Sequence, residues 1–143
     1  MNVVVDASVI VKWVFQAPEA EENTEQALEL LAAIRDGQVS LLQPSHWLVE
    51  VAAVVTRLKP EIAESALELL DAMEFPAVGD LPVLQRASRI SQDLDHHLFD
   101  TLYHAVALEY GCTLITADSK YFRKARHLGR IVSLETWPRA DLG

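Results

Sequence analysis

The segment that decides the fold reads VVVDASVIVKW and occupies residues 3–13. Its three consecutive valines are typical of a short strand that is buried on both faces of a sheet. The apolar run from Ala7 to Phe15 that follows has the pattern of a helix, and Asp6 stands at the junction. We therefore expect a strand that leads directly into a helix, with a carboxylate at the carboxyl end of the strand.

The remainder of the chain alternates between helical and strand-like segments. Short Gly and Pro signals separate these segments, and no internal repeat or low-complexity tract is visible. We predict helices over residues 22–35, from Pro44 or Ser45 to Leu58, from Pro60 onward, and over 83–94, 100–110 and 120–126, with strands over 39–42, 113–116 and 130–133. Strands separated by helices imply crossover connections and hence parallel pairing. The sequence therefore predicts an α/β fold, a three-layer α/β/α sandwich with a central parallel sheet.

Length and composition set the size of the fold and suggest its compartment. The chain has 143 residues, of which 50% are hydrophobic, which is enough for one well-packed core. We treat residues 1–143 as a single domain. A single cysteine, Cys112, cannot form an internal disulfide, and no apolar signal segment follows Met1, so we expect a cytoplasmic protein. No apolar run reaches the roughly 20 residues that span a membrane.

The formal net charge of −9 bears on the choice of ligand. Proteins that bind a polyanion such as RNA usually present a basic surface, so the total charge argues against a nucleic-acid ligand. Carboxylates that hold divalent cations would change the local field, and binding depends on that field more than on the total. An acidic balance also suits a basic peptide partner or ordinary solubility, and composition leaves these readings open.

Two acids follow predicted strands directly. Asp6 ends the first strand, and Asp118 ends the strand that contains residues 114–117. In an open parallel sheet, ligands bind beyond the carboxyl ends of the strands, so both carboxylates are expected at one edge. Each acid also fits a simpler role as the N-cap of the helix that it precedes.

Two further acids lie in predicted helices. Glu50 interrupts an apolar run over residues 47–55, and a buried carboxylate there needs a cation, hydrogen-bond donors or a proton. A boundary position that reaches solvent explains Glu50 equally well. Asp100 begins an apolar helix, where the helix dipole alone favours an acid.

The four acids gain significance as a set. Hard cations such as Mg²⁺ and Mn²⁺ take oxygen ligands, and they allow neighbouring carboxylates to remain ionised together. Two such ions roughly 4 Å apart can activate a water, hold a phosphodiester and stabilise its leaving oxygen, with no protein nucleophile. The set is therefore consistent with metal-dependent phosphodiester hydrolysis.

At this point the sequence resembles a known family. The stretch VVDASVIVKW at residues 4–13 resembles the opening motif of PIN-domain proteins, especially VapC-like toxins of bacterial and archaeal toxin–antitoxin pairs. Glu50 resembles the second acid of the family, FDTLYHA at 99–105 its third motif, and LITAD at 114–118 its fourth. The similarity covers residues 3 to about 134, and the four blocks occur in the expected order.

The resemblance implies an α/β/α fold and RNA cleavage that depends on one or two Mg²⁺ or Mn²⁺ ions. Asp6 and Asp100 would be the principal metal ligands, and Glu50 and Asp118 would complete or extend the site. It further implies a homodimer and a small antitoxin partner. Tyr121 departs from relatives that carry another polar residue after the fourth acid, which leaves a second metal ion open.

The same match assigns supporting roles to two hydroxyl side chains. Ser8 and Thr116 would orient carboxylates, as metal sites generally require. Apart from the match, Lys120 and Arg123 follow Asp118 closely in the sequence and could flank the cleft and hold RNA phosphates. They belong to a basic cluster that also includes Lys124, Arg126 and Arg130, and a solvated helix face explains this cluster equally well.

Three other functions can be compared with this sequence. His97, Asp100 and His104 have three- and four-residue spacings that suit a zinc or transition-metal hydrolase, although no HExxH motif occurs. A phospho-receiver module would need an acidic pair after the first strand and a late lysine, and neither is present. The third rival is a catalytically weak or inactive module that keeps the fold and binds RNA or protein.

Overall fold

A parallel four-stranded sheet forms the centre of the molecule. The computed structural model describes residues 1–15 and 22–138. Strand β1 (Asn2–Val5) pairs with β2 (Ser40–Leu41) on one side and with β5 (Thr113–Thr116) on the other, and β6 (Ile131–Ser133) extends the sheet beyond β5. All three pairings are parallel. In the order β2-β1-β5-β6, strands β1 and β5 are neighbours. Their carboxyl ends therefore lie side by side, although about 110 residues separate them in the sequence.

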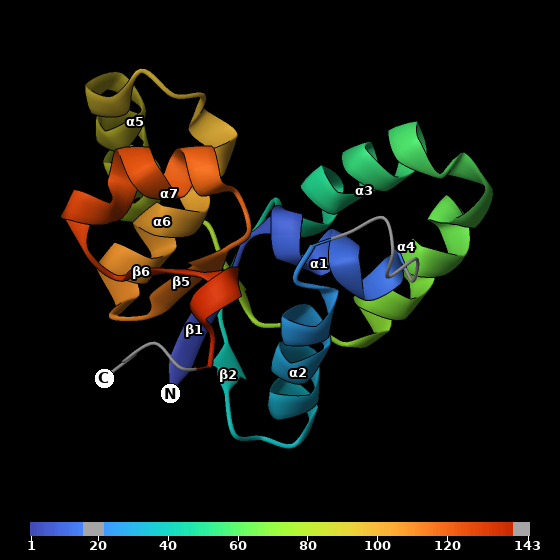
Figure 1. Ribbon diagram of the computed structural model, residues 1–143. Helices are drawn as coiled ribbons and strands as arrows, with labels where there is room; N and C mark the ends of the chain where they lie inside the picture. The colour runs from blue at the N-terminus through green and yellow to red at the C-terminus, as the bar shows by residue number, and fades with distance from the viewer. Residues whose placement is uncertain (16–21, 139–143) are drawn as a thin grey trace.

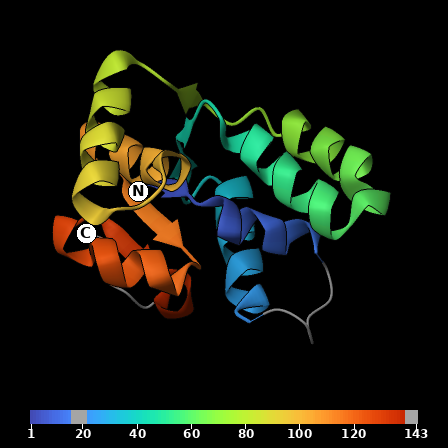
Figure 2. The ribbon, with the colours of Figure 1, turned by 90° about the horizontal axis from the view of Figure 1, so that it is seen from above.

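Helices cover both faces of this sheet (Figure 1). They are α1 (Ala7–Val14), α2 (Thr24–Arg35), α3 (Trp47–Leu58) and α4 (Ala63–Ala72) on one side, and α5 (Leu81–Leu94), α6 (Leu98–Tyr110) and α7 (Ser119–Ala125) on the other. Figure 2 shows the same two groups of helices from above, separated by the strands. The predicted α/β/α sandwich with a central parallel sheet is confirmed.

The core explains why these segments form as they do. Val3, Val4 and Val5 are each 0% exposed, because helices cover both faces of β1. Helix α6 packs against α5 on one side and against β1, β5 and the short strand β3 (Gln43–Pro44) on the other. It is therefore buried around most of its circumference. Three short 3₁₀ helices complete the described elements, at Pro60–Ile62, Arg126–Leu128 and Leu134–Thr136.

The predicted strand over residues 39–42 is divided in the structure. Its first part is β2, and the chain then forms β3 (Gln43–Pro44), which pairs in parallel with β4 (Ala77–Val78). Pro44 therefore belongs to a strand, and the helix expected from Pro44 or Ser45 begins at Trp47. A two-residue pairing between distant segments leaves no periodic pattern, so neither β4 nor this division was predicted.

Gln43 completes the hydrogen bonding of β1 directly before Asp6. Its Nε2 donates to the Val5 carbonyl and its Oε1 accepts from the Val5 amide, both at 2.8 Å, and the side chain is 0% exposed. The amide side chain thus takes the place of a neighbouring strand at the last residue of β1. This contact fixes the point from which the Asp6 side chain projects.

Replacing Gln43 by Ala is expected to lower the free energy of unfolding by about 3 kcal/mol, because two buried backbone groups lose their partners. Urea denaturation measures this change. Gln38→Ala is the matched control, since Gln38 is exposed. A loss at Gln43 no larger than that of the control would contradict the structural role.

No helix in residues 1–15 or 22–138 has the length and hydrophobicity needed to cross a membrane.

Candidate metal centre

Asp6 lies at the carboxyl end of β1, where its own amide donates to the Ile115 carbonyl of β5 at 3.0 Å. Its side chain is largely buried, with the residue 9% exposed. Asp6 Oδ2 accepts from the Ser8 amide at 3.0 Å and from Ser8 Oγ at 2.5 Å. Ser8 Oγ in turn accepts from the Ala117 amide at 3.0 Å. Ser8 therefore orients Asp6 and ties the end of β1 to the end of β5.

Asp118 lies beyond the carboxyl end of β5, on the same edge of the sheet as Asp6. Its Oδ1 accepts from the Tyr121 amide at 3.0 Å, which makes it the N-cap of α7. Thr116 Oγ1 accepts from the Asp118 amide at 3.1 Å. Thr116 thus holds the backbone of this turn, and it contacts no carboxylate in a hydrogen bond among the described residues. Asp6 and Asp118 thus each cap a helix, α1 and α7, and both lie at the carboxyl edge of the sheet.

Glu50 projects from α3, and its Oε2 lies 2.7 Å from His46 Nε2. The same His46 nitrogen donates to the Phe99 carbonyl at 3.2 Å. Glu50 Oε2 is buried and has no hydrogen-bond partner among the described residues. Glu50 Oε2 and His46 Nε2 therefore lie at ion-pair distance, but their geometry is not that of a hydrogen bond. One oxygen of Glu50 remains without a donor, which suits a bound cation.

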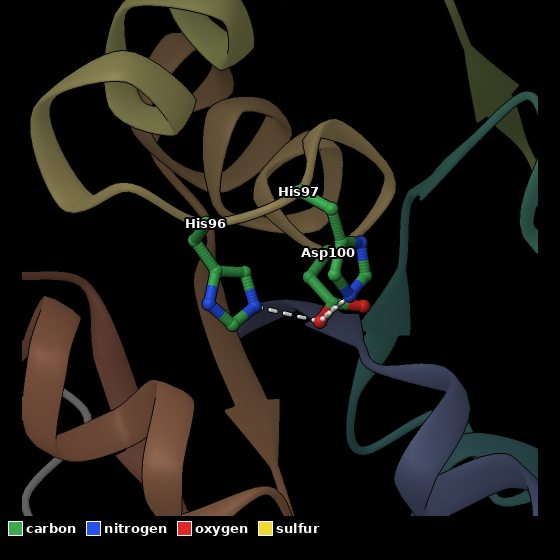
Figure 3. A group of neighbouring side chains, drawn as sticks. All are labelled: His96, His97 and Asp100. Atoms are coloured by element: carbon green, nitrogen blue, oxygen red, sulfur yellow. Dashed lines mark hydrogen bonds and ion pairs between the residues drawn. The ribbon is translucent and has the colours of Figure 1, made fainter.

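Asp100 lies in the first turn of α6 and is flanked by two histidines (Figure 3). His96 Nε2 and His97 Nε2 lie 2.8 Å and 3.0 Å from Asp100 Oδ2. Burial raises the pKa of Asp100 above its usual value, and the charge of Glu50 raises it further. The hydrogen bond from His96 and the charge of His97 act in the opposite direction.

The charges of three acids act on one another at this edge. Burial is the largest cause that raises the pKa of Asp6, to about 7, and the charges of Asp100 and Glu50 contribute. Hydrogen bonds from Ser8 partly offset this increase. A divalent cation beside these carboxylates would favour their ionised forms. The oxygen donors, their burial and their mutual repulsion all fit a hard divalent ion.

The charges of the same acids also act on a buried tyrosine, Tyr103. Tyr103 is 0% exposed, and its hydroxyl has no hydrogen-bond partner among the described residues. Burial raises the pKa of Tyr103 far above its usual value, and the charges of Glu50, Asp6 and Asp100 add to this effect. The sequence pattern did not single out Tyr103, His46 or His96. Their i, i+3 and i, i+4 relations to Asp100 and Glu50 were the available signal.

Asp6, Glu50 and Asp100 act on one another electrostatically, and Asp118 shares the carboxyl edge of the sheet with Asp6, but the four acids do not present a compact set of oxygens. Among the described residues, the only three metal-donor atoms that lie within 4.8 Å of one another belong to His96, His97 and Asp100. An ion shared by Asp6, Glu50 and Asp100 therefore requires these side chains to move closer together.

His104 does not join the histidines at Asp100. It is 0% exposed, and its Nε2 donates to the Gly129 carbonyl at 2.8 Å. Its Nδ1 must then accept, and the Tyr121 hydroxyl donates to it at 2.9 Å. Burial lowers the pKa of His104, which keeps the ring neutral. The set of His97, Asp100 and His104 is therefore not a metal site in this structure, because both nitrogens of His104 are already hydrogen bonded.

His104→Ala is expected to lower the free energy of unfolding by about 3 kcal/mol, through a cavity and through the loss of the hydrogen-bond partner of the buried Tyr121 hydroxyl and of the Gly129 carbonyl. Thermal or urea unfolding measures this loss. His127→Ala is the control, because His127 is an exposed histidine. Equal stability of the two variants would show that His104 does not support the core.

The predicted basic cluster is spread over several environments. Lys120 and Arg123 are exposed on α7, and Arg123 lines a hollow of about 300 Å³ with Ser119 and Ser133, which lie near the ends of β5 and β6. Lys124 donates to the Asp95 carbonyl at 3.2 Å. Arg126 and Arg130 do not lie together beside the acids. Arg126 lies over the Phe122 ring, and Arg130 donates to the Gly111 carbonyl at the opposite edge of the sheet.

Similarity to solved structures supports the fold. The protein PAE2754 from Pyrobaculum aerophilum superposes with a TM-score of 0.65 at 17% identity, over 95% of this chain and 91% of that one. VapBC2 from Rickettsia felis, solved bound to a DNA fragment from its promoter, gives 0.65 at 18% identity, over 93% and 98%. A toxin–antitoxin complex from Klebsiella pneumoniae gives 0.59 at 15% identity, over 92% and 97%.

No curated protein matches the chain. The family model of the PIN domain matches residues 3–128, which include all four acids and most of the described fold. The chain therefore belongs to the PIN-domain family.

Proposed function

We propose that this protein is a divalent-metal-dependent endoribonuclease and the toxin of a toxin–antitoxin pair. The observation that carries the proposal is the set of Asp6, Glu50 and Asp100, whose carboxylates are buried or partly buried and repel one another near the carboxyl edge of the sheet. The PIN-domain family, which is generally one of nucleases, supports the same activity.

Each acid has a role in this proposal. Asp6 and Asp100 bind the ion, with Ser8 holding Asp6 in place and the two neighbouring histidines holding Asp100. Glu50 would offer Oε2, which accepts no hydrogen bond among the described residues although it lies 2.7 Å from His46 Nε2, to the ion or to the attacking water. When bound, Mg²⁺ or Mn²⁺ supplies Lewis acidity, which lowers the pKa of water and offsets negative charge on the scissile phosphate.

Asp118 and α7 extend the proposed site toward the substrate. Asp118 stands at the N-terminus of α7, and its charge acts on Tyr121 together with the charges of Asp6 and Asp100. This position suits either a second ion or the outer coordination of the first. Lys120 and Arg123 on the same helix are available for RNA phosphates, a role that suits exposed cations better than fixed ones.

Cleavage of cellular RNA by the purified protein tests the enzyme proposal. We expect cutting with Mg²⁺ or Mn²⁺, none with EDTA, and none by Glu50→Gln in either metal. Asp93→Asn is the matched control, since Asp93 is exposed on α5. Cutting that persists in EDTA would exclude the metal mechanism. Metal binding by calorimetry without any cleavage would instead favour a catalytically inactive binding module.

We further propose a cytoplasmic protein with a small antitoxin partner and a homodimeric state. The two toxin–antitoxin complexes that share this fold support the partner. Light scattering tests the dimer, and co-expression with a candidate antitoxin tests the partner: we expect a dimeric mass, and a stable complex that no longer cleaves RNA. A monomer that cleaves RNA at full rate with the partner present would contradict them.

A further inference from the structure

Two histidines and one carboxylate form a compact cluster at the start of α6. His96 Nε2 and His97 Nε2 both approach the same oxygen, Asp100 Oδ2, at 2.8 Å and 3.0 Å. All three donor atoms lie within 4.8 Å of one another. In Figure 3, dashed lines join one imidazole nitrogen of each histidine to the same carboxylate oxygen of Asp100.

The local backbone places these side chains together. Asp95 ends α5 in the left-handed conformation, with φ 50° and ψ 55°, which turns the chain sharply before α6. His97 is the N-cap of α6 and Asp100 follows three residues later, so both side chains lie on one side of the first turn. The two imidazole rings are stacked, with their centroids 4.9 Å apart and an interplanar angle of 23°.

The donor chemistry differs from that of the acid site. Two imidazole nitrogens and one carboxylate oxygen are typical ligands of Zn²⁺ and similar transition metals, whereas Mg²⁺ prefers oxygen alone. Zinc bonds of about 2.0–2.1 Å place tetrahedral ligand atoms about 3.3 Å apart. The measured separations of 2.8 Å and 3.0 Å reach that value with a small expansion. Three protein ligands also leave a fourth position for water.

The cluster is accessible from solvent on one side. The His97 side chain is 65% exposed and the His96 side chain is 9% exposed. An ion can therefore enter past His97, while His96 is already held in place by its surroundings. Its ring lies 5.0 Å from the Tyr121 ring, and its carbonyl accepts from Ser91 Oγ.

We propose that His96, His97 and Asp100 bind a transition-metal ion, with Zn²⁺ as the strongest candidate, and that this ion inhibits the nuclease. Inhibition follows because Asp100 is common to both sites: a carboxylate drawn toward Zn²⁺ is lost to the Mg²⁺ or Mn²⁺ ion. The inhibitory part rests on the proposed nuclease function. The binding part depends only on the three side chains.

Lys124 opposes ion binding and sets its strength. Its ammonium group donates to His96 Nδ1 at 3.3 Å and to the Asp95 carbonyl at 3.2 Å. His96 then carries its proton on Nε2, which donates to Asp100. Zn²⁺ requires that Nε2 proton to leave and Nδ1 to become the donor, so Lys124 must release the ring. It can do so while it keeps the Asp95 carbonyl.

Metal binding to the chelator-treated full chain tests the site directly. We expect one Co²⁺ ion to give the visible absorption of a four-coordinate site, and Zn²⁺ to displace it stoichiometrically. His97→Ala and His96→Ala should each weaken Zn²⁺ binding by at least about tenfold, since ligand loss costs no less than loss of an outer partner. Lys124→Met should strengthen it. His127→Ala, an exposed histidine outside the cluster, is the control and should bind as the parent does.

Variants of the acid site separate this proposal from the nuclease proposal. Asp6→Asn and Glu50→Gln leave the three ligands intact, so they should retain Zn²⁺ binding although they are expected to lose RNA cleavage. Zn²⁺ affinity that is unchanged in both histidine variants would overturn the site. Equal loss of Zn²⁺ binding in Asp6→Asn would also overturn it, because the ion would then lie among the acids. If the parent protein does not cleave RNA, the nuclease proposal fails, while Zn²⁺ binding stands or falls separately.

Discussion

Asp100→Asn is expected to reduce Mg²⁺-dependent RNA cleavage by at least about a thousandfold, the scale seen when one member of a cooperating catalytic set is removed. Asparagine has nearly the shape of aspartate but carries no charge, so it retains the packing of α6 and loses the ionic ligand. The partly buried position of Asp100 beside other acids is the reason for the size of the effect. Initial rates on a defined RNA, measured over a range of Mg²⁺ concentrations, give the loss.

The metal dependence separates binding from chemistry in this experiment. If Asp100 holds the ion, excess Mg²⁺ should restore part of the activity of a variant that retains weak affinity. Asp93→Asn should cleave as the parent does, because Asp93 is exposed on α5. Full activity of Asp100→Asn at low Mg²⁺ would remove Asp100 from the proposed site.

Asp6→Asn is expected to make the metal-free protein more stable near neutral pH. Burial raises the pKa of Asp6 from 3.8 to about 7 in the folded protein. Each unit of that change corresponds to 1.36 kcal/mol, so ionisation of Asp6 costs the fold about 4 kcal/mol at pH values above 7. Asparagine at position 6 avoids this cost at every pH, and its side-chain oxygen can still accept from Ser8.

The direction of the pH dependence follows from the two pKa values. Below pH 3.8 the carboxyl group is protonated in both states and Asp6 adds no pH-dependent term. Between pH 3.8 and about 7 the unfolded chain ionises first, so the folded state loses stability as the pH rises. The stability advantage of Asp6→Asn over the parent should therefore grow by about 3 to 4 kcal/mol between pH 4 and pH 7.5.

Urea unfolding in EDTA at the two pH values measures this growth. Asp93→Asn serves as the control and should show no comparable change. Mg²⁺ at about a hundred times its dissociation constant should then stabilise the parent by about 2.7 kcal/mol and leave Asp6→Asn unaffected. An advantage of Asp6→Asn that is the same at both pH values would show that Asp6 does not titrate as its burial requires.

The candidate site shows where prediction from sequence succeeds. Asp6 and Asp118 follow strands, and the rule that parallel strands share a carboxyl edge was enough to place them together. The role of Glu50 was open on the sequence, and its unpaired oxygen beside His46 is visible only in the folded chain. The spacing of the histidines pointed to His97 and His104, whereas the histidines that contact Asp100 are His97 and His96.

The sequence by itself determined the alternation of apolar strands and helices, and with it the parallel sheet, because local periodicity and the need for crossovers act through neighbouring residues. Only the tertiary structure decided that Gln43 completes β1, that β3 pairs with β4, and that His96 rather than His104 faces Asp100. These contacts join segments that are far apart in the chain, or depend on a single left-handed turn at Asp95. Their energies come from burial and from hydrogen-bond partners that exist only after the chain has folded.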